Sequence, residues 1–140
     1  MTRTAVRTVF VSLLLLLGIG IATKQAAAQQ EKVIADGKIE YEENCAGCHG
    51  LSAKGDGKLA DILITRPPDL TQIAKRNGGV FPFWRIYDVI GGEKPVRAHE
   101  FSAMPIWGSR FRGEEKTRYT EPAHIRMLLL THYLESLQEK

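Results

Sequence analysis

The pattern of apolar and polar positions predicts a helix over residues 31–45. The residues of its apolar face, spaced by three and four positions, are Ile34, Gly37, Tyr41 and Cys45. The opposite, outward face is expected to carry Lys38, Glu40, Glu42 and Glu43. Glycine in a buried helix face is costly unless another helix crosses there at close range. Gly37 therefore predicts a crossing.

A second helix, predicted over residues 121–137, is the expected partner of the first. Its apolar stripe repeats at spacings of three and four and consists of Ala123, Met127, Leu130, Leu134 and Leu137. Thr120 is a candidate N-cap, and Pro122 suits a first helical turn. Because Met127 lies on this stripe, we expect its sulfur to be used in core packing.

Shorter elements lie between these two helices. Residues 59–64 predict a short turn, and the two prolines within residues 66–69 stop any helix there. Residues 70–76 predict a helix that ends at the glycines of residues 77–79, and residues 83–90 predict a further helix with a proline at its start. No segment shows sustained strand alternation, so the predicted fold is all-α with long connecting loops.

The N-terminal segment has the organisation of a secretory signal peptide. Arg3 and Arg7 precede an apolar run over residues 9–21, and three alanines end at Ala28. A basic region, an apolar region and an A-x-A site predict cleavage after Ala28. We therefore expect a signal peptide over residues 1–28 and one domain over residues 29–140, exported to the periplasm. The alternative is an uncleaved membrane anchor.

Removal of the signal peptide changes the charge of the protein. The 140-residue precursor has a net charge of +3, with 19 basic and 16 acidic residues. Residues 1–28 contain three of the basic residues and no acidic one. The remaining chain is near neutral, so its charge gives no reason to expect a nucleic-acid partner.

The candidate chemistry of the chain lies in its only two cysteines. They stand in the string Cys45-Ala46-Gly47-Cys48-His49. C-x-x-C-H is the c-type haem attachment signal: each thiol forms a thioether with one vinyl group, and the adjacent imidazole reaches the iron. A disulfide would close too small a loop to stabilise much, a thioredoxin-like pair needs a βαβ setting, and structural zinc needs a fourth ligand.

With these residues in view, the chain resembles a small class I cytochrome c from residue 31 to residue 140. The matching features are Gly37 and Tyr41 before the motif, the segment Ala103-Met104-Pro105-Ile106-Trp107-Gly108, and the ending Tyr133-Leu134-Glu135-Ser136-Leu137. The resemblance implies one covalent haem c, enclosed by loops and short helices. It also implies that the first and last helices cross at a glycine and pack aromatic residues.

The sixth iron ligand decides between an electron carrier and a catalyst. The resemblance assigns the axial thioether to Met104 and the opposite position to His49. His99 lies five residues before Met104 and is the competing ligand, which would give a lower potential. His124 and His132 are expected on the polar face of the last helix.

Further residues are candidates for contacts with the haem. A ligating imidazole donates its second N–H to a carbonyl, and the resemblance gives this role to Pro67 or Pro68. Arg66 and Arg85 are candidate partners of the propionates by charge. Aromatic residues that could line the haem or bond a propionate are Trp107, Trp84, Tyr87, Phe81 and Phe83.

The sequence thus predicts a periplasmic one-electron carrier without a catalytic residue, which exchanges electrons with redox protein partners. One alternative is a sensor or peroxidase-like enzyme with an open sixth site. Another is the electron-transfer subunit of a periplasmic dehydrogenase. Basic residues that could surround the haem edge and steer an acidic partner are Lys54, Lys58, Lys94 and Arg97.

Overall fold

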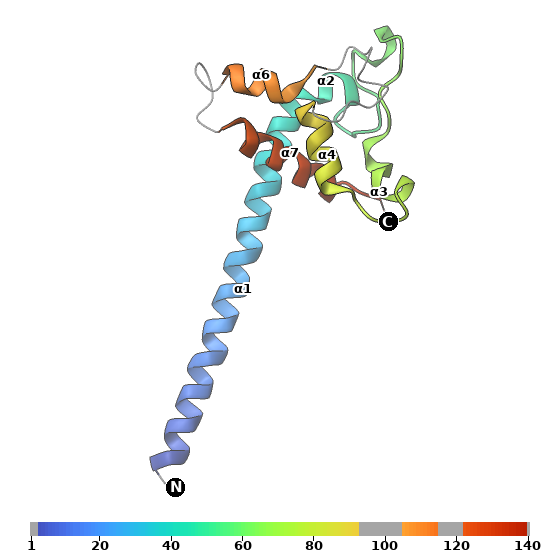
Figure 1. Cartoon of the computed structure of the whole chain (residues 1–140). Helices are drawn as coiled ribbons and strands as arrows, with labels where there is room; N and C mark the ends of the chain where they lie inside the picture. Colours follow the sequence, from blue (N-terminus) through green and yellow to red (C-terminus); the bar gives the residue numbers. More distant parts are fainter. Residues whose placement is uncertain (1–2, 93–104, 115–121, 140) are drawn as a thin grey trace. The chain divides into compact units, whose positions relative to one another are not determined.

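The computed structural model describes residues 3–92, 105–114 and 122–139. In these residues the chain forms α-helices and short 3-10 helices and no strand, which confirms the all-α prediction (Figure 1). The chain divides into two compact units, Met1–Lys32 and Val33–Lys140. The haem motif and all but the first two residues of the segment that resembles a cytochrome c lie in the second unit.

The first helix, α1 (Arg3–Asn44), begins much earlier than the predicted residue 31. Residues 24–32 consist of Lys, Gln, Ala and Glu, which all favour a helix, and they contain neither Gly nor Pro. Nothing in this stretch ends a helix. The predicted cleavage site after Ala28 lies within this stretch and stays a prediction. Among the described residues, no helix has both the length and the apolar character needed to cross a membrane.

The predicted crossing at Gly37 is present, and its partner is α7 (Ala123–Ser136). A Cβ atom added at Gly37 would lie 2.8 Å from the carbonyl carbon of Leu129 and 2.9 Å from Cβ of Tyr133. Beside this contact, the rings of Tyr41 and Tyr133 pack with their centroids 5.3 Å apart. The absence of a side chain at Gly37 is what lets the two backbones come this close.

One prediction for the outward face of α1 is wrong. Lys38 and Glu42 are exposed and form an i,i+4 ion pair of 3.6 Å, as expected for that face. Glu40 instead is buried, and its carboxylate forms an ion pair with Arg126 of α7. A charged group rarely leaves water without such a partner, and Arg126 lies 86 residues away in the sequence.

Two more helices complete the packing around α7. As predicted, α4 (Phe83–Gly91) follows Pro82, and it ends at Gly92, whose φ of 83° is left-handed. The sequence analysis did not predict α6 (Trp107–Glu114). Gly108 of α6 approaches the end of α4 so closely that a Cβ there would lie 2.7 Å from the carbonyl oxygen of Gly91.

The core of the described residues is built mainly from these helices. Its buried members are Tyr41, Ala53, Ile90, Trp107, Phe111, Ala123, Met127, Leu130, Tyr133 and Leu134. The expectation that Met127 packs in the core is confirmed. His124 and His132 are exposed on α7, also as expected.

The loop after the haem motif contains three short helical segments. They are η1 (Ala60–Ile62), η2 (Leu70–Gln72) and α3 (Ile73–Arg76), and the last two correspond to the helix predicted over residues 70–76. The Asp69 carboxylate caps η2 by accepting a hydrogen bond from the Thr71 amide at 2.8 Å. Because this bond favours the charged carboxylate, the Thr71 side chain and amide hold the pKa of Asp69 below its usual value.

The end of the chain is tied to this loop. The Gln138 side chain accepts a hydrogen bond from the Ala74 amide at 2.8 Å and donates one to the Leu70 carbonyl at 2.9 Å. The Glu139 amide donates to the Thr71 carbonyl at 3.0 Å. These bonds satisfy backbone groups of η2 and α3 that such short helices cannot satisfy themselves.

Candidate haem site

Cys48 and His49 lie on one short helical turn, α2 (Ala46–His49), and Cys45 directly precedes it as the N-cap residue. The amides of Cys48 and His49 both donate to the Cys45 carbonyl, at 3.1 and 2.9 Å. Residues three positions apart on a helical turn share a side, so Cys45 and Cys48 face the same way. Both thiols are free.

The loop that follows folds back onto this turn. The amides of Gly55, Gly57 and Leu59 donate to the carbonyls of residues 49, 48 and 47 at 2.9, 3.2 and 2.9 Å. A Cβ at Gly57 would lie 2.5 Å from the carbonyl carbon of Cys48, so only glycine fits there. The backbone of the motif is therefore fixed by its own downstream loop.

Tyr41 ties the end of α1 to the motif. Its hydroxyl donates a buried hydrogen bond of 2.8 Å to the Gly50 carbonyl. Burial raises the pKa of Tyr41 far above its usual value of 10.0. The phenol therefore stays protonated and remains a donor throughout the neutral range.

The environment of Cys45 disfavours a charged sulfur. Burial raises the pKa of the Cys45 thiol to about 12, and the charges of Glu40 and Cys48 contribute further. A zinc site needs the thiolate form, which this environment opposes. In the part of the chain that the structure describes, no group of three or more His, Cys, Asp or Glu residues could hold a metal ion. A thioether carries no charge, so it suits this position.

Large apolar side chains lie exposed in the segments around the motif. Leu59 packs over the turn, with its Cδ1 3.6 Å from the position of a Cβ at Gly47. Leu51, Ile62 and Ile64, in the loop that follows the motif, are also exposed.

A family comparison agrees with this geometry. The family model for cytochrome c matches residues 34–105, which is more than half of the 140 residues. The chain belongs to the cytochrome c family. It is a c-type cytochrome, that is, a haem-binding electron-transfer protein, and the small monohaem class I organisation is consistent with its length. No curated protein and no solved structure matches the chain.

The residues of this cytochrome fit a haem c. Two free thiols face one way on a rigid turn, the sulfur of Cys45 lies where an uncharged thioether is favoured, and the imidazole of His49 is buried directly beside them. Cys45 and Cys48 would hold the porphyrin covalently, and His49 would ligate the iron. Met104, His99, Lys94 and Arg97 lie outside the described residues, so their predicted roles stay predictions.

The remaining candidates of the cytochrome are placed as follows. The Pro67 carbonyl faces Gly55, so closely that a Cβ there would clash with it, and its predicted bond to His49, like that of Pro68, stays a prediction. Arg66 Nε donates to the Gly55 carbonyl at 3.2 Å. Arg66 thus already has a role in holding the loop that follows the motif.

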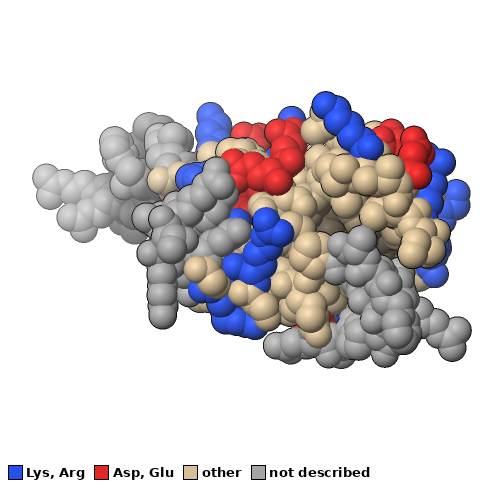
Figure 2. Space-filling model, turned by 90° about the horizontal axis from the view of Figure 1, so that it is seen from above, with Lys and Arg blue, Asp and Glu red and all other residues tan. Residues whose placement is uncertain are grey.

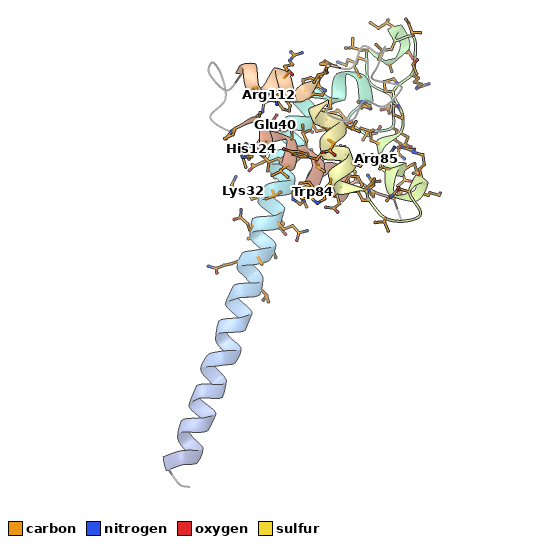
Figure 3. The ribbon with its side chains drawn as sticks, viewed as in Figure 1. Lys32, Glu40, Trp84, Arg85, Arg112 and His124 are labelled. Carbon is orange, nitrogen blue, oxygen red and sulfur yellow. The ribbon has the colours of Figure 1, made fainter. Side chains whose placement is uncertain are left out.

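The aromatic candidates differ in how deeply they are buried. Trp107 is buried in the core, where its ring packs on Phe111 at 5.5 Å. Trp84 is 66% exposed and lies on α4 next to the exposed Arg85 (Figure 3). Phe81 and Tyr87 are partly buried and pack against the core. Trp84 and Arg85 therefore remain open to a propionate, whereas Trp107 has a packing role.

Among the basic residues proposed to steer a partner, Lys54 has a local partner of its own. Its Nζ lies 3.0 Å from Oε1 of Glu139. The hydrogen bond to Glu139 raises the pKa of Lys54, and the same bond lowers the pKa of Glu139. Figure 2 shows acidic and basic side chains interspersed on one face of the molecule, without a field of a single sign.

Sequence reasoning missed the most deeply buried charged group of the site region, Arg126. The spacing of apolar residues on the last helix does not reveal that Arg126, which directly precedes Met127, is buried with them. The sequence nevertheless contains a sign of this pair. Each of the two helices predicted to cross carries a charged residue near the crossing, Glu40 on one and Arg126 on the other, and a charge buried at a helix crossing needs an opposite charge as its partner.

Proposed function

We propose that this cytochrome is a one-electron carrier with a single covalent haem c and His49/Met104 ligation. The observation that carries the proposal is the rigid turn that presents Cys45, Cys48 and His49 together. The family match supports it further, because residues 34–105 include Met104.

The chain's own residues define the chemistry of the site. When bound, haem supplies an iron that cycles between the ferric and ferrous states and so carries one electron. His49 and Met104 would hold the iron, and the soft thioether of Met104 would raise the potential relative to two histidines. With both residues as ligands, small molecules would have no free site on the iron, so the haem would supply electron transfer rather than catalysis at the iron.

We place the protein in the periplasm, between a donor and an acceptor that are themselves redox proteins. The N-terminal signal pattern supports export, and covalent haem attachment belongs to compartments outside the cytoplasm. A free shuttle and a subunit of a periplasmic dehydrogenase both fit this role. Gel filtration of the protein from its native source separates the two, because only the subunit elutes in a stable complex.

The experiment that tests the proposal is the visible spectrum of the ferric protein, expressed as the full chain in a host that matures c-type haem. Methionine ligation gives a weak red band of sulfur-to-iron charge transfer. A high-spin spectrum would instead support a sensor or enzyme with an open site, and a bis-histidine spectrum would assign the ligand role to His99. Absence of covalent haem would overturn the proposal altogether.

Met104→Ala should keep the haem attached but abolish the red band and lower the reduction potential, because the thioether that stabilises ferrous iron is lost. The matched control is Met127→Leu, which removes the other internal sulfur from a core position and should keep both the band and the potential. The measurements are the ferric spectrum and a redox titration. An unchanged band in Met104→Ala would exclude Met104 as the ligand.

A further inference from the structure

A buried ion pair joins the two helices that cross in this cytochrome. Arg126 of α7 donates from Nε to Oε1 and from Nη2 to Oε2 of Glu40 on α1, and both bonds are 2.8 Å long. The two side chains are 0% and 11% exposed. Two parallel bonds between planar groups fix the orientation of both side chains.

Stability alone is a poor explanation for this pair. Moving two charges out of water costs free energy that their mutual attraction often does not exceed, and well-packed apolar residues commonly replace such pairs without loss. Loss of one partner is a different matter, because the other charge is then left buried alone. The pair is therefore better suited to fixing a geometry than to stabilising the fold.

On one side, the pair reaches the helix that follows the predicted sixth ligand. The Arg126 guanidinium carbon lies 3.8 Å from the ring centroid of Phe111, a fully buried residue of α6. The Phe111 ring in turn packs on Trp107, the first residue of α6, which follows Met104 by three positions. A guanidinium held flat over a ring restricts where that ring can lie.

On the other side, the pair reaches the haem anchor. Asn44 is the last residue of α1 and directly precedes Cys45. Its side-chain amide donates to the Glu40 carboxylate at 3.2 Å and to the Glu40 carbonyl at 3.0 Å. The charge of Glu40 also acts on the Cys45 thiol. Arg126 is thus connected through Glu40 to the start of the motif and through Phe111 to the start of α6.

We propose that Arg126 is a positioning residue for the sixth iron ligand. Its contacts with Glu40 and Phe111 hold two elements in one fixed relation: the end of α1, which leads into the haem motif, and the helix α6, which begins three positions after Met104 in the sequence. Weakening either contact makes Met104 easier to displace. This inference rests on the proposed His49/Met104 ligation.

The test is the binding of imidazole to the ferric holoprotein at pH 7, because added imidazole must displace the sixth ligand. Three variants weaken the contacts of Arg126 in different ways. Arg126→Lys keeps the positive charge but loses the planar guanidinium, and Glu40→Gln removes the carboxylate charge. Phe111→Leu removes the aromatic ring beside Arg126 and leaves the ion pair intact. Each should bind imidazole at least about tenfold more tightly than the wild type, with unchanged helical circular dichroism.

The matched control is Glu42→Gln. It breaks the exposed ion pair with Lys38, two positions from Glu40 on the same helix. Exposed pairs contribute little, so its imidazole affinity should stay within about twofold of the wild type. A second variant, Glu40→Leu with Arg126→Met, replaces the pair by apolar side chains. It should regain thermal stability and still bind imidazole more tightly.

The outcomes separate this inference from the proposed function. Absence of the red band in the wild-type protein overturns the methionine ligation, and the inference with it. If the wild type has the band but the single variants bind imidazole no more tightly, only the positioning role is overturned. The same holds if wild-type imidazole affinity returns together with stability in the apolar double variant, because the ion pair would then act through stability alone.

Discussion

At the scale of single residues, Tyr41 has the most direct link to the motif. It is almost completely buried, and its ring contacts Tyr133 of α7 while its hydroxyl bonds the carbonyl directly after His49. A buried carbonyl that loses its donor costs more than the bond itself contributed. Tyr41 therefore joins the helix crossing to the haem motif through one side chain.

Tyr41 also predicts a dependence of stability on alkaline pH. Its folded-state pKa is raised above the usual 10.0, chiefly by burial. The folded state therefore keeps its proton where the unfolded state has lost it. This contribution is complete below pH 10 and is lost as the pH rises above it, by up to about 1.4 kcal/mol per pH unit.

Tyr41→Phe should consequently flatten the decline of the unfolding free energy above pH 10, and cost about 1 kcal/mol at neutral pH through the lost bond. Urea unfolding of the holoprotein from pH 7 to pH 11 measures both effects. Parallel curves for the two proteins above pH 10 would show that the ionisation of Tyr41 is not linked to folding.

At the scale of elements, the crossing of α1 and α7 depends on Gly37. Gly37→Ala should lower the free energy of unfolding by about 1–3 kcal/mol, because the added methyl meets the backbone of Leu129, which cannot rotate away. This loss would exceed the gain of about 1 kcal/mol in helix propensity. Thermal unfolding followed by helical circular dichroism measures it.

Gly113→Ala is the control for this substitution. Gly113 also lies in a helix, but a Cβ there meets nothing within 4 Å. The propensity term then acts alone, and stability should rise by up to about 1 kcal/mol. If both variants were stabilised, the close approach at Gly37 would not limit the crossing.

These elements also show what the sequence can and cannot predict. Gly37 predicted the crossing because the requirement of a glycine on a buried helix face is local. The helix α6 was missed because its eight residues contain two glycines and only two buried aromatic residues, Trp107 and Phe111. Glu40 was assigned to the surface because helical periodicity contains no information about a partner 86 residues away.

The candidate haem site likewise has a part that the sequence predicts and a part that it does not. Cys45, Cys48 and His49 are adjacent in the sequence, so one helical turn fixes their relation. The contacts of Arg66 and Trp107, by contrast, depend on how a loop and a helix pack, which spacing alone does not determine. The placement of residues that are adjacent in the chain was therefore predictable, whereas contacts made by tertiary packing were not.

At the scale of the whole molecule, the proposed export gives a direct prediction. The periplasmic protein should begin at Gln29 and carry one haem, because Ala26 and Ala28 supply the small residues that the signal peptidase needs. Mass spectrometry of the intact protein measures both properties. Ala28→Arg should block cleavage and leave the chain in the membrane fraction, and full-length wild-type chain in the soluble periplasmic fraction would contradict cleavage at this site.

The hydrogen bonds that fix the motif join residues close together in the sequence, whereas those that join the crossing helices connect distant residues. This difference sets the order in which the two parts of the chain can fold. Tyr41 and Gly50 are 9 residues apart, whereas Glu40 and Arg126 are 86 apart. Loop-closure entropy makes the longer connection more costly by about 2 kcal/mol. The segment that receives the haem can therefore close on itself while the C-terminal helix is still emerging during export, and the pairing of the chain's ends comes last.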